Sequence, residues 1–252
     1  MKQIQSRHLL FAILACAASA AASAQSSTAT PTAAATPSTL NVAVGGVISP
    51  GSCTPASSAI AFDLNKINPT SLKDKAETPL APIVQDLSIK CDGDTSVALS
   101  VAGTAKAAAP SDAAFDHKAT GIQAEAKKGY IYDLVDVATT TKRIGRYVFQ
   151  FRNFTYTTSA DNAKALKATV VTSSDRASWT SVAETTANAA QLKSDGSTFV
   201  SFANPATPAV PVSAKEFDGS IVIGAAIVPK SELTINDELK FRGETTITLS
   251  YL

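Results

Sequence analysis

Apolar and polar residues alternate along several short stretches of this chain. A period of two is typical of β-strands that bury one face. Gly, Pro, Asn and Asp separate the stretches, and these residues favour turns. The clearest runs are residues 84–91, 97–101, 147–151, 220–228 and 244–252.

Weaker runs add further strand candidates. They are residues 40–48, 59–64, 130–137, 168–172 and 199–202. With the clear runs this gives about ten strands, and a β-sandwich is the natural way to bury so many alternating faces. We expect turns or loops at Cys91–Asp94, at 66–82 with its prolines, and in an Ala- and Lys-rich insertion at 103–129.

The N-terminus has the pattern of a signal peptide. Lys2 and Arg7 precede the apolar run 9–15, and small residues follow up to Ala22-Ser23-Ala24. Such an A-x-A ending marks a cleavage site and predicts a mature chain that starts at Gln25. The apolar run is too short for a membrane anchor. Lipidation at Cys16 is an alternative, although Leu14 fits that kind of site poorly.

The mature chain is then divided into a tether and one domain. Residues 25–38 contain no charge and no large apolar side chain, so we expect a flexible Thr/Ala/Pro-rich tether. We expect residues 39–252 to form a single β-sandwich domain with long inserted loops.

Cleavage at this site changes the charge and the cysteine count. Two of the 22 basic residues leave with the signal, so the formal net charge falls from +1 to −1. Cys53 and Cys91 remain. In an oxidising compartment an even number of cysteines favours a disulfide. By closing the loop between Cys53 and Cys91, this disulfide would stabilise the fold by about 4 kcal/mol. Two free buried thiols are the alternative.

The composition excludes several kinds of function. A net charge near zero lacks the basic stripe of a nucleic-acid-binding protein. The chain has only two histidines, His8 and His117, so neither a multi-histidine zinc site nor a His-dependent triad is expected. Motifs for serine hydrolases, zinc proteases and nucleotide binding are absent from the sequence. We therefore expect no enzyme activity, no cofactor and no metal.

Two local motifs have ordinary explanations. Asp92-Gly93-Asp94 lacks the further ligands of a calcium loop, so a β-turn explains it better. Ser173–Trp179 loosely resembles a hairpin motif of the form S-x-D-x-G-x-T-W, without its glycine. Trp179, the single tryptophan, could stack on a sugar or pack under its own hairpin.

The two ends of the mature chain carry the most informative pattern. Leu40, Val42, Val44, Gly46 and Ile48 form one row of a strand, and the embedded glycine allows another chain to approach closely. Another such row, of Ile247, Leu249 and Tyr251, runs nearly to the last residue. An apolar terminal strand is an aggregation hazard unless a partner strand pairs with it. Two ordinary sandwich strands are the alternative.

These ends resemble the subunits of chaperone–usher pili of Gram-negative bacteria. In both, an alternating segment with an embedded glycine precedes the first cysteine, here with Gly46 seven residues before Cys53, and an aromatic residue stands next to last, here Tyr251. The chain is similar in particular to a poorly characterised family of secreted β-fimbria-like proteins. The stretches that carry this resemblance are Gly46–Pro55, Lys142–Tyr147 and Arg242–Leu252.

The resemblance implies an immunoglobulin-like (pilin-type) sandwich that lacks its last strand. It implies a disulfide between Cys53 and Cys91, and a donor strand of Leu40, Val42, Val44, Gly46 and Ile48. Ile247, Leu249, Tyr251 and Leu252 would form the groove edge that a periplasmic chaperone covers until the next subunit's donor strand replaces it at an outer-membrane usher.

Three functional hypotheses follow. The first is a fimbrial subunit that passes through the periplasm to the cell surface and binds other pilus subunits. The second is a tip adhesin or solitary secreted protein that binds a glycan or surface near Trp179 and the Tyr147–Tyr156 aromatics. The third, an exported enzyme, has no set of residues behind it. Whether 40–48 acts in trans or completes its own sandwich stays open.

Overall fold

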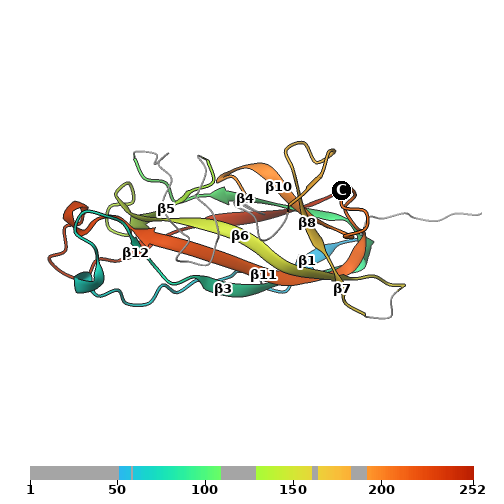
Figure 1. Ribbon diagram of the computed structural model, residues 1–252, viewed down its shortest axis with the longest axis horizontal. Helices are drawn as coiled ribbons and strands as arrows, with labels where there is room; N and C mark the ends of the chain where they lie inside the picture. Colours follow the sequence, from blue (N-terminus) through green and yellow to red (C-terminus); the bar gives the residue numbers. More distant parts are fainter. Residues whose placement is uncertain (1–50, 58, 109–128, 161–163, 183–191) are drawn as a thin grey trace, which may run out of the picture. The chain divides into compact units, whose positions relative to one another are not determined.

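The computed structural model describes residues 51–57, 59–108, 129–160, 164–182 and 192–252. The predicted donor segment, the signal peptide, the tether, Cys16 and His117 lie outside these residues. Within them the chain is almost entirely β (Figure 1). The elements are β1 (Cys53–Pro55), η1 (Pro69–Ser71), β2 (Thr78–Pro79), β3 (Ile83–Thr95), β4 (Val97–Gly103), β5 (Tyr132–Asp136), β6 (Arg143–Thr157), β7 (Leu166–Lys167), β8 (Thr169–Ser173), β9 (Thr180–Ser181), β10 (Asp195–Ala203), β11 (Ala214–Ile227), η3 (Lys230–Glu232), β12 (Phe241–Arg242) and β13 (Thr245–Tyr251).

The strands form two antiparallel sheets. The first has the order β1-β3-β11-β6-β5-β12, with β2 paired to β11 and β7 to β6. The second has the order β13-β4-β10-β8-β9. Their inner faces share one hydrophobic core. The predicted β-sandwich with one disulfide is therefore confirmed.

Aromatic side chains fill the middle of this core. Phe154 of β6 stacks on Phe202 of β10 with ring centroids 4.2 Å apart, and Phe202 lies 5.3 Å from the ring of Phe217 in β11. All three are buried. The alternation in each strand thus brings rings from both sheets together, which is how this part of the sandwich excludes water.

Two sequence expectations about the first strands are wrong. Residues 91–94 are not a turn, because β3 continues through them to Thr95 and the chain reverses at Ser96. Asp92 and Asp94 are instead bound separately, to the hydroxyls of Ser52 and Ser159. Residues 59–64 keep the alternating exposure of a strand but belong to no β-ladder. The periodicity correctly indicated an extended chain, but pairing also requires a neighbouring strand.

Candidate functional site

The disulfide fixes the start of the first strand. Cys53 and Cys91 face each other in the β1–β3 register, and a disulfide joins them across 38 residues of sequence. Asp92 N–H donates to Ser52 O, and Ala56 N–H donates to Ser88 O. Bonded and non-bonded positions alternate in an antiparallel pair, so the N–H of Cys53 points away from β3.

The C-terminal strand forms one edge of the second sheet. Among the residues that the structure describes, β13 pairs with β4 alone. The bonds from Thr104 N–H to Glu244 O and from Leu252 N–H to Ser96 O set the parity of this ladder. The even-numbered residues of β13 therefore bond to β4. The backbone groups of Thr245, Ile247, Leu249 and Tyr251 point away from it.

A large groove lies beside this edge, between the two sheets. Its volume is about 1450 Å³. Ile247 and Leu249 line it from β13, Ile89 and Leu99 from β3 and β4, and Ile223 from β11. Most of its lining is aliphatic, and the inner part of the lining, with Ile89 and Leu99, belongs to the buried core.

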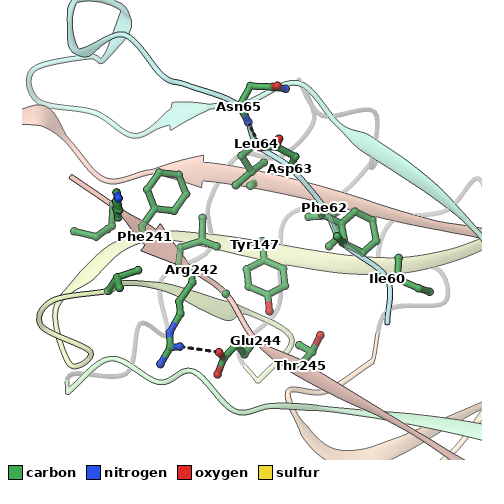
Figure 2. Close-up of a pocket in the computed structure, with 18 of the residues that line it drawn as sticks. Ile60, Phe62, Asp63, Leu64, Asn65, Tyr147, Phe241, Arg242, Glu244 and Thr245 are labelled. Atoms are coloured by element: carbon green, nitrogen blue, oxygen red, sulfur yellow. Dashed lines mark hydrogen bonds and ion pairs between the residues drawn. The ribbon is translucent and has the colours of Figure 1, made fainter. Parts of the chain in front are cut away.

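The extended segment 59–67 lies across the groove from β13. Figure 2 shows Ile60, Phe62 and Leu64 along one side of the pocket and Thr245 on the other, with Tyr147 between them. These three side chains are partly buried against the core. One edge of the groove is thus a strand and the other is an extended chain without a ladder.

Tyr147 brings a polar group to the groove. It is 5% exposed and stacks on Tyr132 with ring centroids 5.2 Å apart. Burial raises the pKa of its phenol, against the smaller effect of a hydrogen bond with Thr245. Gly243 passes next to this ring, where a Cβ would collide with it. Gly243 and Tyr147 therefore pack closely against each other at this end of β13.

Charged residues also line the groove, at Asp63 and Lys66 of the segment 59–67 and in the connection that leads to β13. Arg242 and Glu244 form an exposed ion pair with a 3.0 Å separation, visible in Figure 2. No group of acidic, cysteine or histidine residues suited to a metal occurs in the described part of the chain. The geometry fits an apolar, extended occupant better than a charged one.

The predicted edge residues differ in their surroundings. Ile247 and Leu249 line the groove, whereas Tyr251 and Leu252 lie outside its lining and are 46% and 45% exposed. The Tyr251 hydroxyl accepts a 2.9 Å hydrogen bond from Cys53 N–H. Nothing in the sequence pattern pointed to this contact, because it joins residues 198 positions apart.

The structure separates the aromatic residues of the adhesin hypothesis. Tyr147 and Tyr156 are buried, so neither offers a surface platform for a sugar. Trp179 is half-buried just before β9 and does not line the groove. In the preceding turn Asp175 accepts bonds from Ala177 N–H and Ser178 N–H. These bonds, with that from Ser178 the strongest influence, lower the pKa of Asp175 to about 2.

Hydrophobic patterning does not identify the residues on the side of the groove opposite β13. The loop 66–82 and the connection 229–244 supply Ile67, Leu72, Leu233 and Phe241 to its lining. These residues show no regular period, so hydrophobic patterning alone could not have placed them.

The described residues contain no helix long and apolar enough to cross a membrane.

Comparison with known proteins leaves the family open. No protein-family model matches the chain, and no curated protein matches it.

Proposed function

We propose that this protein is a subunit of a fimbria- or pilus-like surface fibre, in which a strand from one copy completes the sandwich of the next. The observation that carries the proposal is the apolar groove beside β13. Thr245, Ile247, Leu249 and Tyr251 direct their backbone groups to that side, away from β4. An added strand would satisfy them and cover the aliphatic lining.

The occupant that fits is residues 40–48 of a second copy. The segment is uncharged and carries its apolar row on alternate positions. At about 3.3 Å per residue its nine residues extend about 26 Å, enough to follow all seven residues of β13. Gly46, which has no side chain, would let the inserted backbone approach the lining closely.

The energetics favour a stable complex. Burying Leu40, Val42, Val44 and Ile48 at about 2 kcal/mol each gives a gross gain of about 8 kcal/mol, before the cost of ordering the segment. Main-chain hydrogen bonds add affinity independent of sequence, and the pockets for alternate side chains fix the register.

The direction of insertion decides between a fibre and a closed pair. A donor antiparallel to β13 would bring its own Cys53 to the Gly243 end of the acceptor. The acceptor's Cys53 lies at the opposite end, beside Tyr251. This head-to-tail contact repeats without closing, whereas a parallel donor would allow two copies to exchange strands and stop. A fibre therefore requires the antiparallel direction.

The proposal also implies partners during export. An empty groove with an apolar strand edge would aggregate in water. A periplasmic chaperone would cover the edge formed by Ile247, Leu249, Tyr251 and Leu252. An outer-membrane usher would then exchange the chaperone's strand for the donor strand of the next subunit. The role is structural, without catalysis or a cofactor.

A denaturing gel without boiling tests the proposal. We expect a ladder of oligomers that collapses to monomer on boiling, because strand exchange is stable but not covalent. Gly46→Arg should abolish the ladder, since it would place a long charged side chain on the row that faces the aliphatic groove. Gly45→Arg is the matched control, because residue 45 lies off the apolar row, and its ladder should persist.

Two gel results would contradict the proposal. One is a folded wild-type monomer with no ladder, which would mean that the sandwich needs no second copy. The other is a ladder equally sensitive to Gly45→Arg and Gly46→Arg, which would mean that the apolar row does not enter a groove.

A further inference from the structure

Tyr251 joins the edges of the two sheets at one end of the groove. Its hydroxyl accepts the 2.9 Å hydrogen bond from Cys53 N–H. Cys53 belongs to β1, the edge of the first sheet, and Tyr251 to β13, the edge of the second. The bond therefore links the edges of the two sheets just beyond the lining of the groove.

The Cys53 N–H group, which donates this hydrogen bond, is held in place by the contacts of β1 with β3. The disulfide ties Cys53 to Cys91, and the bonds of Ser52 and Ala56 hold β1 against β3. Because hydrogen-bonded and non-bonded positions alternate along β1, the Cys53 N–H points away from β3 and can reach the Tyr251 hydroxyl. A continuous path thus runs from β3 through the disulfide and the Tyr251 phenol to β13.

The acceptor side is held less firmly. The Tyr251 side chain lies on the same face of β13 as Ile247 and Leu249. However, Tyr251 is 46% exposed and lies beyond the groove lining. Core packing alone does not fix its ring, so the hydroxyl bond contributes to where the end of β13 lies. The Leu252 N–H bond to Ser96 O anchors the same end to β4 but makes no link to the other sheet.

We propose that Tyr251 is a positioning residue that holds the edges β1 and β13 together at the cysteine end of the groove. This inference rests on the proposed function, because it concerns how long an inserted strand stays. Without the hydroxyl, β1 and β13 separate more easily at this end. The inserted strand then frays from there and leaves sooner. Because the disulfide positions Cys53, its effect on strand retention is coupled to that of Tyr251.

Release of a peptide measures the effect directly. The full chain carrying Gly46→Arg, which disables its own donor segment, is mixed with a fluorescent peptide of residues 39–49. We expect Tyr251→Phe to raise the dissociation rate constant about three- to tenfold, the range for one lost hydrogen bond. The ring and its apolar contacts remain. Thr248→Ala, on the outward row of β13, is the matched control and should leave the rate constant within about twofold.

A double-mutant cycle tests the coupling to the disulfide. In a chain that also carries Cys53→Ala and Cys91→Ala, Tyr251→Phe should change the dissociation rate constant by less than about twofold. The reason is that the disulfide no longer holds the N–H group of residue 53 in place. If this chain does not fold, the comparison of Tyr251→Phe with Thr248→Ala decides alone.

The outcomes separate the two proposals. If the peptide does not bind the chain with Tyr251 intact, the proposed function fails, whatever Tyr251 does. If the peptide binds and Tyr251→Phe releases it at the unchanged rate, the positioning role is wrong and the groove function stands. A lower free energy of unfolding in Tyr251→Phe with an unchanged release rate would show a merely structural contact and would also overturn the inference.

Discussion

The sandwich has two regions of core with different degrees of completion. In the middle, Phe154, Phe202 and Phe217 are fully buried by strands of the same chain. Beside β13, the inward side chains Ile247 and Leu249 are only partly buried and line an open groove. The same alternating pattern produced both regions. What differs is whether a neighbouring strand is available to cover them.

This difference implies that the two regions respond differently to assembly. The closed region depends only on the chain's own folding. The groove region should gain further burial from a second copy, mainly at the partly buried side chains of Ile247 and Leu249. Substitutions can therefore separate the stability of the subunit from the stability of the fibre.

The largest effect is expected in the closed region. Phe202→Ala should lower the free energy of unfolding by about 3–5 kcal/mol, because it leaves a cavity beneath Phe154 and Phe217. Chemical denaturation of the monomer, blocked from assembly by Gly46→Arg, measures it. A loss below about 1 kcal/mol would mean that this core is not tightly packed.

A groove substitution should act mainly on the assembly. Leu249→Ala should cost the blocked monomer only about 1 kcal/mol, because the side chain is already half out of the core. It should lower the temperature at which the unboiled ladder collapses more than Phe202→Ala does. The outward-facing Thr248→Ala is the control. The distinction between the regions would disappear if Leu249→Ala weakened only the monomer.

Alkaline pH distinguishes two buried tyrosines. Burial raises the pKa of Tyr132, within the core, and of Tyr147, at the groove, above the ordinary tyrosine value of about 10. The stability gained by keeping these phenols neutral is fully present below pH 10 and is lost as pH rises from there toward the folded-state pKa values. Tyr147→Phe should reduce this alkaline loss.

Assembly should affect only one of these tyrosines. A strand in the groove would bury Tyr147 further, so its pKa should be higher in the fibre than in the blocked monomer. That of Tyr132 should not change. Ultraviolet titration of Tyr132→Phe and Tyr147→Phe in both states separates the signals. Equal behaviour of both phenols would argue against an occupant in the groove.

The smallest effect is expected at Trp179. Because its side chain is half-buried outside the groove, Trp179→Ala should leave the gel ladder unchanged and cost the monomer less than about 1 kcal/mol. A glycan array probes the adhesin hypothesis. Wild-type binding that Trp179→Ala abolishes would support that hypothesis and add a binding role to the subunit.

Much of the fold could be predicted from hydrophobic alternation. The pattern identified the long strands β3, β6, β11 and β13, although parts of β6 and β11 are buried on both faces rather than on one. The even number of cysteines in the mature chain, Cys53 and Cys91, indicated the disulfide that the structure contains. Strand ends were less accurate, as β11 begins at Ala214 rather than Ser220.

The groove could be predicted only in part. The row of Ile247 and Leu249 was readable because it lies within one strand. The opposite wall was not, since 59–64 has the period of a strand but lacks a partner, and Phe241 belongs to β12, a strand of only two residues. The bond between Tyr251 and Cys53 depends on the tertiary arrangement of two edges, which no local pattern encodes.

Hydrogen exchange along β13 shows whether an inserted strand pairs with this edge of the second sheet. In the blocked monomer the amides of Thr246, Thr248 and Ser250 should be protected by β4, and those of Ile247, Leu249 and Tyr251 should exchange rapidly. Adding the peptide of residues 39–49 should protect the odd-numbered amides and leave the even-numbered ones unchanged. If the odd-numbered amides still exchange rapidly once the peptide is bound, no strand pairs with β13, and the account of the groove is wrong.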